Sequence, residues 1–385
     1  MTASNALKMS AANNGTETVA EIAARLAPGF AANAAKADEG DRFVADNYDA
    51  LKAVGLVEAA VPVELGGRGA EIAELCDMIR IIAGSCGSTG LAFSMHTHQV
   101  AIPAWRWRHQ KATAVEPLLK RIAAEKIVLL SSGGSDWIGG SGKAEKVDGG
   151  YRITARKVFT SGAEAGDLLM TGAILDGEPA KVLHFGVPMK APEVSIVDTW
   201  RTLGMRGTGS NDVVVDGLVI PEANVALARN AGEWHPLFQV ISIIAFPLIY
   251  AAYLGVAESA RDIAIELAKK KPANPYAVSL AGRMDTSLRA AQLAHRHMVA
   301  TTEKNAPSAA SVNETMISRA LVAKHAIEAV ELAMELAGGA GFYRAAGLER
   351  RFRDVQGARF HPLQQGPQAT YAGSMALGLP VDKVF

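Results

Sequence analysis

The spacing of apolar residues changes twice along the 385-residue chain. From residue 17 to about residue 125, apolar residues recur every three to four positions, which is the spacing of an amphipathic helix. From residue 126 to about residue 225, the chain instead holds short β-branched runs separated by Gly and Asp, which predict strands and turns. Long helical patterns return after residue 233. The order helix, sheet, helix predicts an α+β protein.

We expect three domains: an N-terminal α-helical domain (1–125), a middle β-barrel or β-sandwich domain (126–230) and a C-terminal helical domain (231–385). The clearest predicted strands are residues 127–130, 151–154, 168–170, 182–187 and 213–215. The long C-terminal helices are predicted over residues 247–270, 277–303 and 312–338. With 49% hydrophobic residues, the chain can bury a large core.

Charge and composition exclude several kinds of partner. Lys plus Arg and Asp plus Glu each number 39, so the net charge is zero and no nucleic-acid or anionic-membrane surface is indicated. The most apolar run, residues 240–257, is interrupted by Pro247 and predicts a buried helix rather than a membrane span. Cys76 and Cys86 are too few for a disulfide framework or a metal quartet. We therefore predict a cytoplasmic protein with no metal site.

Four sequence motifs follow one another in a fixed order. They are Lys157-Val-Phe-Thr-Ser-Gly-Ala, Leu203-Gly-Met-Arg-Gly-Thr-Gly-Ser with the strand after it, Leu336-Ala-Gly-Gly-Ala-Gly-Phe-Tyr, and Arg353-Asp-Val-Gln-Gly-Ala-Arg-Phe-His-Pro-Leu. With the helix, sheet, helix order, they resemble the acyl-CoA dehydrogenase superfamily over nearly the whole chain. The resemblance implies a C-terminal four-helix bundle, and an FAD, or alternatively FMN, between the β domain and the C-terminal helices. It also implies a homotetramer in which a neighbouring subunit completes the flavin site.

The resemblance implies flavin contacts in two loops of the middle domain. In the first motif, beside Phe159 and Thr160, Ser161 would donate a hydrogen bond to flavin N5 or O4. The bland alternative is an ordinary Ser-Gly turn. The loop at 131–136 would line the flavin and the substrate through Ser132 and Ser135, or else it is a plain turn after a strand.

Three further features bear on the cofactor. The glycine-rich motif would meet the dinucleotide of the neighbouring subunit through Gly338, Gly339 and Gly341. Arg206 is either a turn-stabilising charge near the flavin or a substrate contact. The chain reads Lys269-Lys-Lys-Pro where the family carries the Arg-x-x-Phe-Gly segment that reaches the FAD pyrophosphate. One anchor for FAD is therefore missing.

The catalytic carboxylate of the family is missing from both of its usual positions. Counted from Arg353-Asp354 it falls at Pro362, and the family's alternative position falls on Ala245. Dehydrogenation of an acyl thioester needs such a base to take the α-proton. Flavin monooxygenases of the same superfamily receive reduced flavin, form a C4a-hydroperoxide and place a histidine where His361 stands. An imidazole can donate a hydrogen bond to the peroxide and exchange a proton near neutral pH.

A second histidine is expected to reach the site from the N-terminal domain. His96 and His98 lie on a predicted helix that faces the pocket in the family. Residues two positions apart do not share a helical face, so at most one of the two enters the site.

The leading hypothesis is a reduced-flavin monooxygenase in which His361 serves the oxygenated flavin. The runner-up is an acyl-CoA dehydrogenase whose base is Glu331, Glu335 or a water held by His361. A third hypothesis is a flavin-binding protein without catalysis, because a fold alone does not establish a reaction. The expected partners are a small-molecule substrate, either an acyl-CoA or a small aromatic or aliphatic compound, and a flavin reductase or an electron-transfer flavoprotein.

Overall fold

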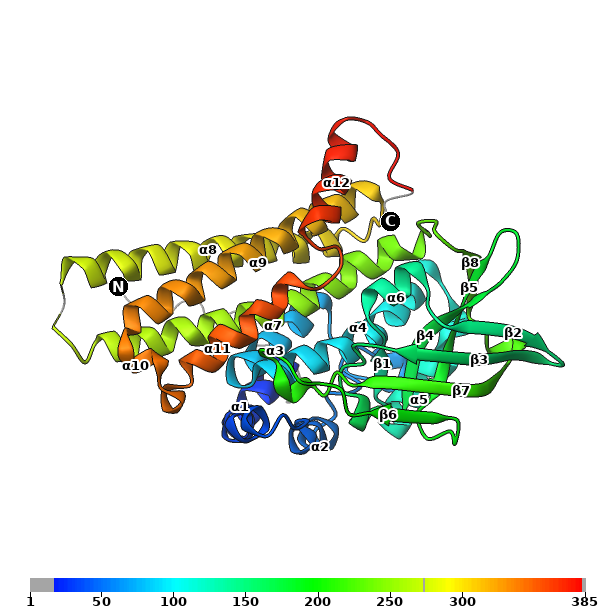
Figure 1. Ribbon diagram of the computed structural model, residues 1–385, viewed down its shortest axis with the longest axis horizontal. Coiled ribbons are helices and arrows are strands. Elements are labelled where there is room, and N and C mark those ends of the chain that lie inside the picture. The colour runs from blue at the N-terminus through cyan, green and yellow to red at the C-terminus, as the bar shows by residue number, and fades with distance from the viewer. Residues whose placement is uncertain (1–16, 273, 383–385) are drawn as a thin grey trace.

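The computed structural model describes residues 17–272 and 274–382, and its first part is helical, as predicted (Figure 1). Helix α1 begins with a capping box, in which the Thr18 hydroxyl and the Glu21 carboxylate each accept a hydrogen bond from the other residue's backbone amide. Helix α4 is buried along most of its length and forms the centre of this part. The helices are α1 Val19–Glu39, α2 Ala45–Ala53, α3 Ile72–Ser85, α4 Gly87–Gln110 and α5 Glu116–Glu125.

The middle part folds into one mixed sheet, which confirms the predicted β domain. Its strands lie in the order β6-β7-β3-β2-β4-β5-β8, and β1 pairs with β4 in parallel. In the described residues the strands are β1 Leu129–Ser131, β2 Lys143–Val147, β3 Gly150–Lys157, β4 Leu168–Leu175, β5 Lys181–Pro188, β6 Val194–Val197, β7 Asp212–Pro221 and β8 Leu227–Asn230.

Strands β2, β6 and β8 and the short helix α6 (Gly134–Gly139) were not predicted. Most side chains of the three strands are at least partly exposed, so the strands carry no continuous apolar run. Helix α6 replaces the loop expected at this place, and its Asp136 side chain is buried against residues distant in the sequence. These elements therefore depend on long-range contacts, and no local sequence pattern predicts them.

The C-terminal part consists of long helices, as predicted. The structure corrects the start of the first one, because α7 begins ten residues before Pro247 and includes that proline. Packing overrides the proline here: in the most apolar 18-residue window of α7, 94% of the residues are buried inside the protein, although the helix is long and apolar enough to span a membrane. The helices are α7 Leu237–Ala268, α8 Pro275–Glu303, α9 Ala309–Ala337, α10 Gly339–Phe342, α11 Leu348–Val355 and α12 Gln365–Ala376.

Helices α7, α8, α9 and α11 run side by side and form the four-helix bundle (Figure 1). Helices α3 and α4 pack against α7, and the sheet lies at one end of the bundle while α10 lies at the other. One continuous hydrophobic core includes residues from all three parts. The division into 1–125, 126–230 and 231–385 therefore stays a prediction.

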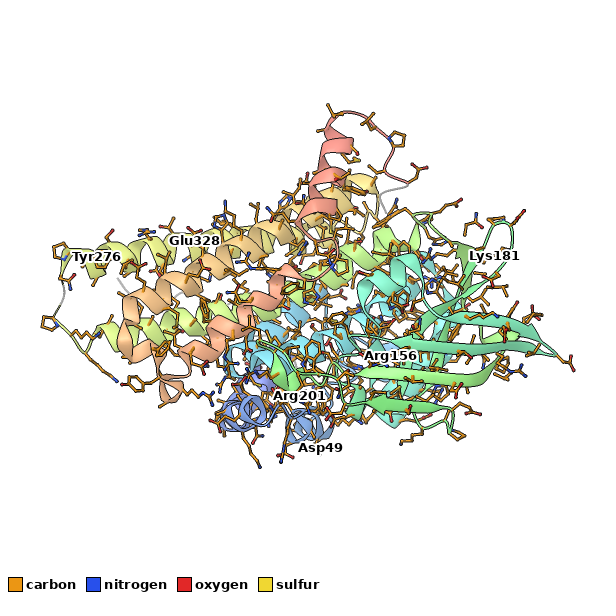
Figure 2. The ribbon with its side chains drawn as sticks, viewed as in Figure 1. Asp49, Arg156, Lys181, Arg201, Tyr276 and Glu328 are labelled. Carbon is orange, nitrogen blue, oxygen red and sulfur yellow. The ribbon has the colours of Figure 1, made fainter. Side chains whose placement is uncertain are left out.

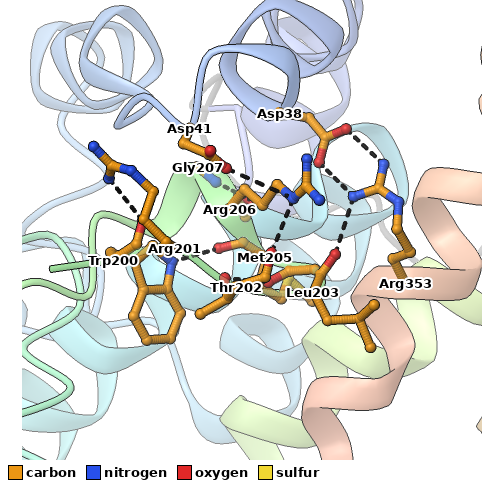
Figure 3. A network of polar contacts seen from close by, with 12 residues as sticks. Asp38, Asp41, Trp200, Arg201, Thr202, Leu203, Met205, Arg206, Gly207 and Arg353 are labelled. Carbon is orange, nitrogen blue, oxygen red and sulfur yellow. Dashed lines mark hydrogen bonds and ion pairs between the residues drawn. The ribbon is translucent and has the colours of Figure 1, made fainter.

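Two of the family motifs contact each other where the N-terminal helices meet the C-terminal part. The Arg353 guanidinium donates to both oxygens of the Asp38 carboxylate, at 2.9 and 2.6 Å, and to the Leu203 carbonyl at 3.2 Å (Figure 3). The buried Asp354 carboxylate accepts a 2.5 Å hydrogen bond from the Met205 amide. These contacts join α1, the turn before the 3₁₀ segment η4 (Arg206–Thr208), and α11, so they fix the sheet relative to both helical parts.

Gly204 is required at this junction, and we expect Gly204→Ala to destabilise the protein by about 1–3 kcal/mol. A Cβ at this position would come within 2.3 Å of the Arg353 carbonyl carbon and oxygen, which are main-chain atoms with little freedom to move. Chemical denaturation measures the effect. Gly282→Ala in helix α8 is the control, because nothing lies within 4 Å of its Cβ and alanine favours a helix. Equal stability of the two variants would contradict the prediction.

Candidate active site

His361 lies between the 3₁₀ segment η7 (Gln356–Arg359) and helix α12, and two tyrosines of α7 pack against its ring. The ring centroids are 5.5 Å from Tyr253 and 6.1 Å from Tyr250. The Tyr253 hydroxyl lies 2.6 Å from Nε2 of His361. Helix α7 therefore sets the direction of the imidazole.

A buried arginine holds the main chain on both sides of His361. Arg319 of α9 is 2% exposed, and its guanidinium donates to the carbonyls of Ala358 and Leu363. Its Nε also donates to the Tyr250 hydroxyl at 2.7 Å, and that hydroxyl donates to the Ala358 carbonyl at 2.9 Å. The segment that carries His361 is thus anchored before and after the histidine.

The surroundings of His361 keep its ring neutral. Burial, with smaller contributions from Arg319 and His98, lowers the pKa of His361 to about 3. A neutral imidazole has one donor nitrogen and one acceptor nitrogen. At neutral pH, the ring can therefore donate one hydrogen bond and accept another.

Of the two predicted histidines of α4, His98 contributes to the lowered pKa of His361. His96 uses both ring nitrogens in the frame of the protein: Nδ1 accepts from the Leu129 amide at 3.0 Å, so Nε2 carries the proton and donates to the Val57 carbonyl at 2.8 Å. His96 thereby ties strand β1 to the N-terminal helices and has no free ring nitrogen for a substrate. His98 is paired as well: its Nε2 accepts from the Gln99 side-chain amide at 3.3 Å, and its Nδ1 donates to the Ser94 carbonyl at 3.0 Å. That one of the pair enters the site therefore stays a prediction.

The loop after β1 faces Pro362, the residue that follows His361. A Cβ on Gly134 would lie 2.4 Å from Pro362 Cγ, so the two segments are in direct contact. The Ser132 hydroxyl is buried and donates to the Asp136 carboxylate at 2.5 Å, whereas Ser135 is exposed. The loop thus lies against the segment that carries His361, and the Ser132 hydroxyl is already bound to the protein. The flavin contacts of Ser132 and Ser135 stay a prediction.

An ion pair that sequence analysis missed lies beneath this loop. Lys157 is 0% exposed, and its Nζ lies 2.9 Å from Asp136 Oδ1. Nζ also donates to the carbonyls of Ser141 and Gly172, at 2.9 and 2.5 Å. Burial lowers the pKa of Lys157, and the Asp136 carboxylate opposes this shift. Side chains along β3 alternate between buried and exposed, and Lys157 falls at a buried position of this alternation. Its place in the alternation is the signal that would have indicated a buried lysine.

The turn after β3 presents an aromatic ring and a serine together. Phe159 adopts a left-handed backbone (φ 56°), its side chain is 59% exposed, and its ring meets Trp200 edge to face at 5.9 Å. Thr160 is fully buried and anchors the turn, and the Ser161 hydroxyl lies 2.8 Å from that of Ser210. A non-glycine residue held in the left-handed region is typical of ligand sites.

This turn fits a flavin. The isoalloxazine ring has a flat apolar face and polar atoms along its edge. The exposed Phe159 ring offers an apolar contact, and Ser161, two residues later in the same turn, offers a hydroxyl. The fit therefore rests on side chains contributed by one turn of the sheet.

The other predicted flavin contacts are Arg206, on the segment beside this turn, and the glycines at the far end of the bundle. The Arg206 side chain donates to the Thr202 carbonyl at 2.9 Å and lies 3.6 Å from Asp41, which agrees with the turn-stabilising alternative (Figure 3). Gly338, Gly339 and Gly341 lie where α9 ends and α10 begins, at the end of the bundle away from the sheet (Figure 1). Within one subunit the glycine turn and Ser161 cannot share a ligand.

The two glutamates considered as alternative bases are exposed on α9. Glu331 and Glu335 lie twelve and sixteen residues beyond Arg319, which in a helix is roughly 18 and 24 Å from the anchor of the His361 segment. The Glu335 carboxylate accepts a hydrogen bond from Tyr276, whose place at the end of the bundle is seen in Figure 2. Neither glutamate is placed to serve as a base beside His361 of its own subunit.

Tyr250, Tyr253 and Arg319 were not predicted as site residues from the sequence. The tyrosines were hidden in the apolar run of α7, where they look like core residues. For Arg319 a signal exists, because it falls on the apolar stripe of α9, between Met316 and Val322. A charged residue on such a stripe indicates a buried polar partner.

Comparison with known proteins adds the following findings. Residues 15–121 match the family model of the acyl-CoA dehydrogenase N-terminal domain, and residues 248–365 match that of the C-terminal domain. Amino sugar nitrososynthase DnmZ from Streptomyces peucetius is 26% identical over 348 residues, 86% of each chain. The oxygenase component of p-hydroxyphenylacetate 3-hydroxylase from Acinetobacter baumannii is 25% identical over 360 residues, 86% of this chain and 82% of that one. The X-ray structure of KijD3 in complex with FMN and dTDP-3-amino-2,3,6-trideoxy-4-keto-3-methyl-D-glucose has a TM-score of 0.85 at 26% identity, over 96% of each chain.

Proposed function

Because the chain belongs to the acyl-CoA dehydrogenase superfamily and is a flavin-dependent oxidoreductase, we propose that it is a monooxygenase that receives reduced flavin. The observation that carries the proposal is His361, a neutral imidazole held by Tyr253 directly before Pro362, the position at which the family's dehydrogenases have a carboxylate. Pro362 and Ala245 occupy the two carboxylate positions, and neither side chain can accept a proton. The hydroxylase and nitrososynthase relatives support the same class of reaction.

The chain's own residues supply hydrogen bonding and proton transfer in this proposal. When bound and reduced, the flavin supplies the activation of oxygen. His361 can donate a hydrogen bond to an oxygen atom beside the flavin and exchange a proton with it. His98 of α4 is a second buried imidazole whose charge influences His361, and its ring nitrogens are paired with Ser94 and Gln99.

The hydroxyl chain at Ser161 supports a reduced flavin. The Thr208 hydroxyl donates to the Met205 carbonyl at 2.9 Å, so at 2.7 Å it accepts from Ser210. Ser210 in turn accepts from Ser161 at 2.8 Å. The Ser161 hydroxyl can therefore accept a hydrogen bond from the flavin but not donate one, which reverses the direction expected from the sequence. An accepting hydroxyl suits a reduced flavin, because its N5 then carries a hydrogen.

We propose FMN as the flavin and a separate reductase as its source. The FAD anchor is missing at Lys269–Lys271 in the sequence, and KijD3, a relative of similar length, is described with FMN. The relative from Acinetobacter baumannii is named as an oxygenase component, which supports a second, reducing component. The relatives' substrates support a small aromatic compound or a sugar amine as the substrate class.

A second subunit would complete the flavin site in this proposal. Gly338 to Gly341 lie at the end of the bundle away from Ser161, so a flavin at Ser161 can meet such a turn only from another copy of the chain. Light scattering on the purified protein should therefore give an oligomer, and a monomer that turns over substrate would contradict this part.

One pair of experiments separates the candidate functions. Protein mixed with reduced FMN and then with oxygen should convert a phenol or an amine from a substrate panel into an oxygenated product. The oxidised flavoprotein, titrated without oxygen with acyl-CoA thioesters of several chain lengths, should keep its flavin absorbance. Bleaching by an acyl-CoA would establish the dehydrogenase instead, and failure to bind any flavin would leave a protein without this catalysis.

We expect Ser161→Ala to weaken binding of reduced FMN by about 3–10-fold and binding of oxidised FMN by less, because one accepted hydrogen bond contributes about 0.5–1.5 kcal/mol. Anaerobic fluorescence titration of both redox states measures the two affinities. Thr208→Val is the direction control, since without the Thr208 hydroxyl Ser210 is free to donate to Ser161. Equal losses for both redox states in Ser161→Ala would contradict the accepting role.

A further inference from the structure

In the described part of the chain, the hydroxyl of Tyr253 is the one polar group of helix α7 that contacts the His361 imidazole. Their atoms Oη and Nε2 lie 2.6 Å apart, although the residues are 108 positions apart in the sequence. Tyr253 is 0% exposed, and its ring stands 5.5 Å from the imidazole. The contact is short and enclosed, so it must have one defined direction.

The direction follows from the needs of the Tyr253 hydroxyl. Burial raises the pKa of Tyr253 well above its ordinary value, so the hydroxyl keeps its hydrogen. Among the described residues, His361 Nε2 is the hydroxyl's only hydrogen-bond partner. If Nε2 donated instead, the hydroxyl hydrogen would be buried without an acceptor, which disfavours that arrangement by about tenfold or more.

We propose that Tyr253 donates to His361 Nε2 and thereby places the imidazole proton on Nδ1, making Nδ1 the donor that faces the flavin and substrate. Tyr253 is a positioning residue in this inference, and the inference rests on the proposed function of His361. In the part of the chain that the structure describes, Nδ1 has no hydrogen-bond partner, while the histidine is partly exposed. The proton on Nδ1 is therefore available to a bound molecule.

The other groups around the His361 ring favour its neutral state. Only a neutral imidazole has two tautomers. Arg319 of α9 and His98 of α4 both lower the pKa of His361, after burial itself, and Tyr250 of α7 adds only a ring edge and a hydroxyl used by Arg319. No carboxylate contacts the imidazole among the described residues. A protonated ring would donate from both nitrogens, so only the neutral ring makes the direction of the Tyr253 hydrogen bond decisive.

The test measures the tautomer directly. Protein with ¹⁵N-labelled histidine rings is examined by NMR at pH 7, with His361→Gln to assign the signal. We expect a protonated Nδ1 and an unprotonated Nε2 in the wild type, and a shift of population towards protonated Nε2 in Tyr253→Phe. A wild-type ring protonated on Nε2, or an unchanged tautomer in Tyr253→Phe, would overturn the inference.

A second measurement follows the consequence for the reaction. With reduced FMN and oxygen, Tyr253→Phe should lose about 3–10-fold in product formed per flavin oxidised, with hydrogen peroxide released instead and FMN affinity retained. Tyr371→Phe is the matched control, because it also removes one hydroxyl from a fully buried tyrosine, where that hydroxyl donates to the Ala309 carbonyl at 3.3 Å. An equal loss in Tyr371→Phe would contradict a specific role.

The two measurements separate this inference from the proposed function. The NMR signal reports the tautomer whether or not the protein oxygenates any substrate. An intact tautomer effect without oxygenation would remove only the monooxygenase proposal. Oxygenation that persists with no tautomer effect would remove only the role of Tyr253.

Discussion

His361→Ala should abolish product formation while leaving FMN affinity largely unchanged. General acid–base catalysis by a positioned side chain contributes about 10²–10⁴-fold, so a loss of this size is expected in product formed per flavin oxidised. Flavin oxidation itself should continue, with hydrogen peroxide as the product, because oxygen still reacts with reduced flavin. Product and peroxide are measured in the same assay.

The variant also leaves the buried Tyr253 hydroxyl without its partner, so its folding must be checked. His361→Asn retains a polar group beside Tyr253, and it should fold more stably than the alanine variant without restoring the proton exchange. His297→Ala is the control for histidine loss, because His297 is exposed and paired with Glu314 on the surface. Product formation that survives in both His361 variants would refute the proposed role.

Lys157→Met should destabilise the protein by about 3–5 kcal/mol, because it leaves the buried Asp136 carboxylate without its cation. The carbonyls of Ser141 and Gly172 lose a donor in the same variant. Helix α6 carries both Asp136 and Gly134, and Gly134 supports Pro362, so product formation per flavin should fall as well. Urea denaturation measures the stability.

The matched surface variant is Lys146→Met, which breaks the exposed pair with Glu222 at 2.7 Å. Exposed pairs contribute about 0–1 kcal/mol, so this variant should stay close to the wild type. The double variant Asp136→Leu, Lys157→Met should recover part of the loss, since it removes the unpaired charge but not the unsatisfied carbonyls. Similar losses in Lys157→Met and Lys146→Met would show that burial adds nothing to this pair.

Much of the fold could be predicted from the sequence because it depends on local spacing. The long helices repeat their apolar residues about every 3.6 positions and the clearest strands every 2 positions. This repeat can be read directly from the sequence. Among the missed elements, β2, β6, β8 and α6 have mostly exposed side chains or depend on Asp136 meeting Lys157. Their formation required contacts that only the folded chain supplies. The helices α10, α11 and α12 were also missed, because helical structure was predicted to end at Gly338.

The site divides in the same way. His361 could be chosen from the sequence because residue type and distance from Arg353-Asp354 are properties of the chain itself. That His96 is taken up by the frame of the protein could not be predicted, because it depends on His96 meeting Leu129 and Val57 across the fold. The direction of the Ser161 hydroxyl depends likewise on Ser210 and Thr208.

The sequence by itself therefore determined the order of the elements and which chemical groups the chain possesses, including the absence of a carboxylate at Pro362 and Ala245. Only the tertiary structure decided how those groups act. Tyr253 reaches His361 across 108 positions, and Lys157 lies buried rather than at the surface. The physical reason is that a side chain's protonation and hydrogen-bond direction depend on burial and on its partners, and both are made by long-range packing.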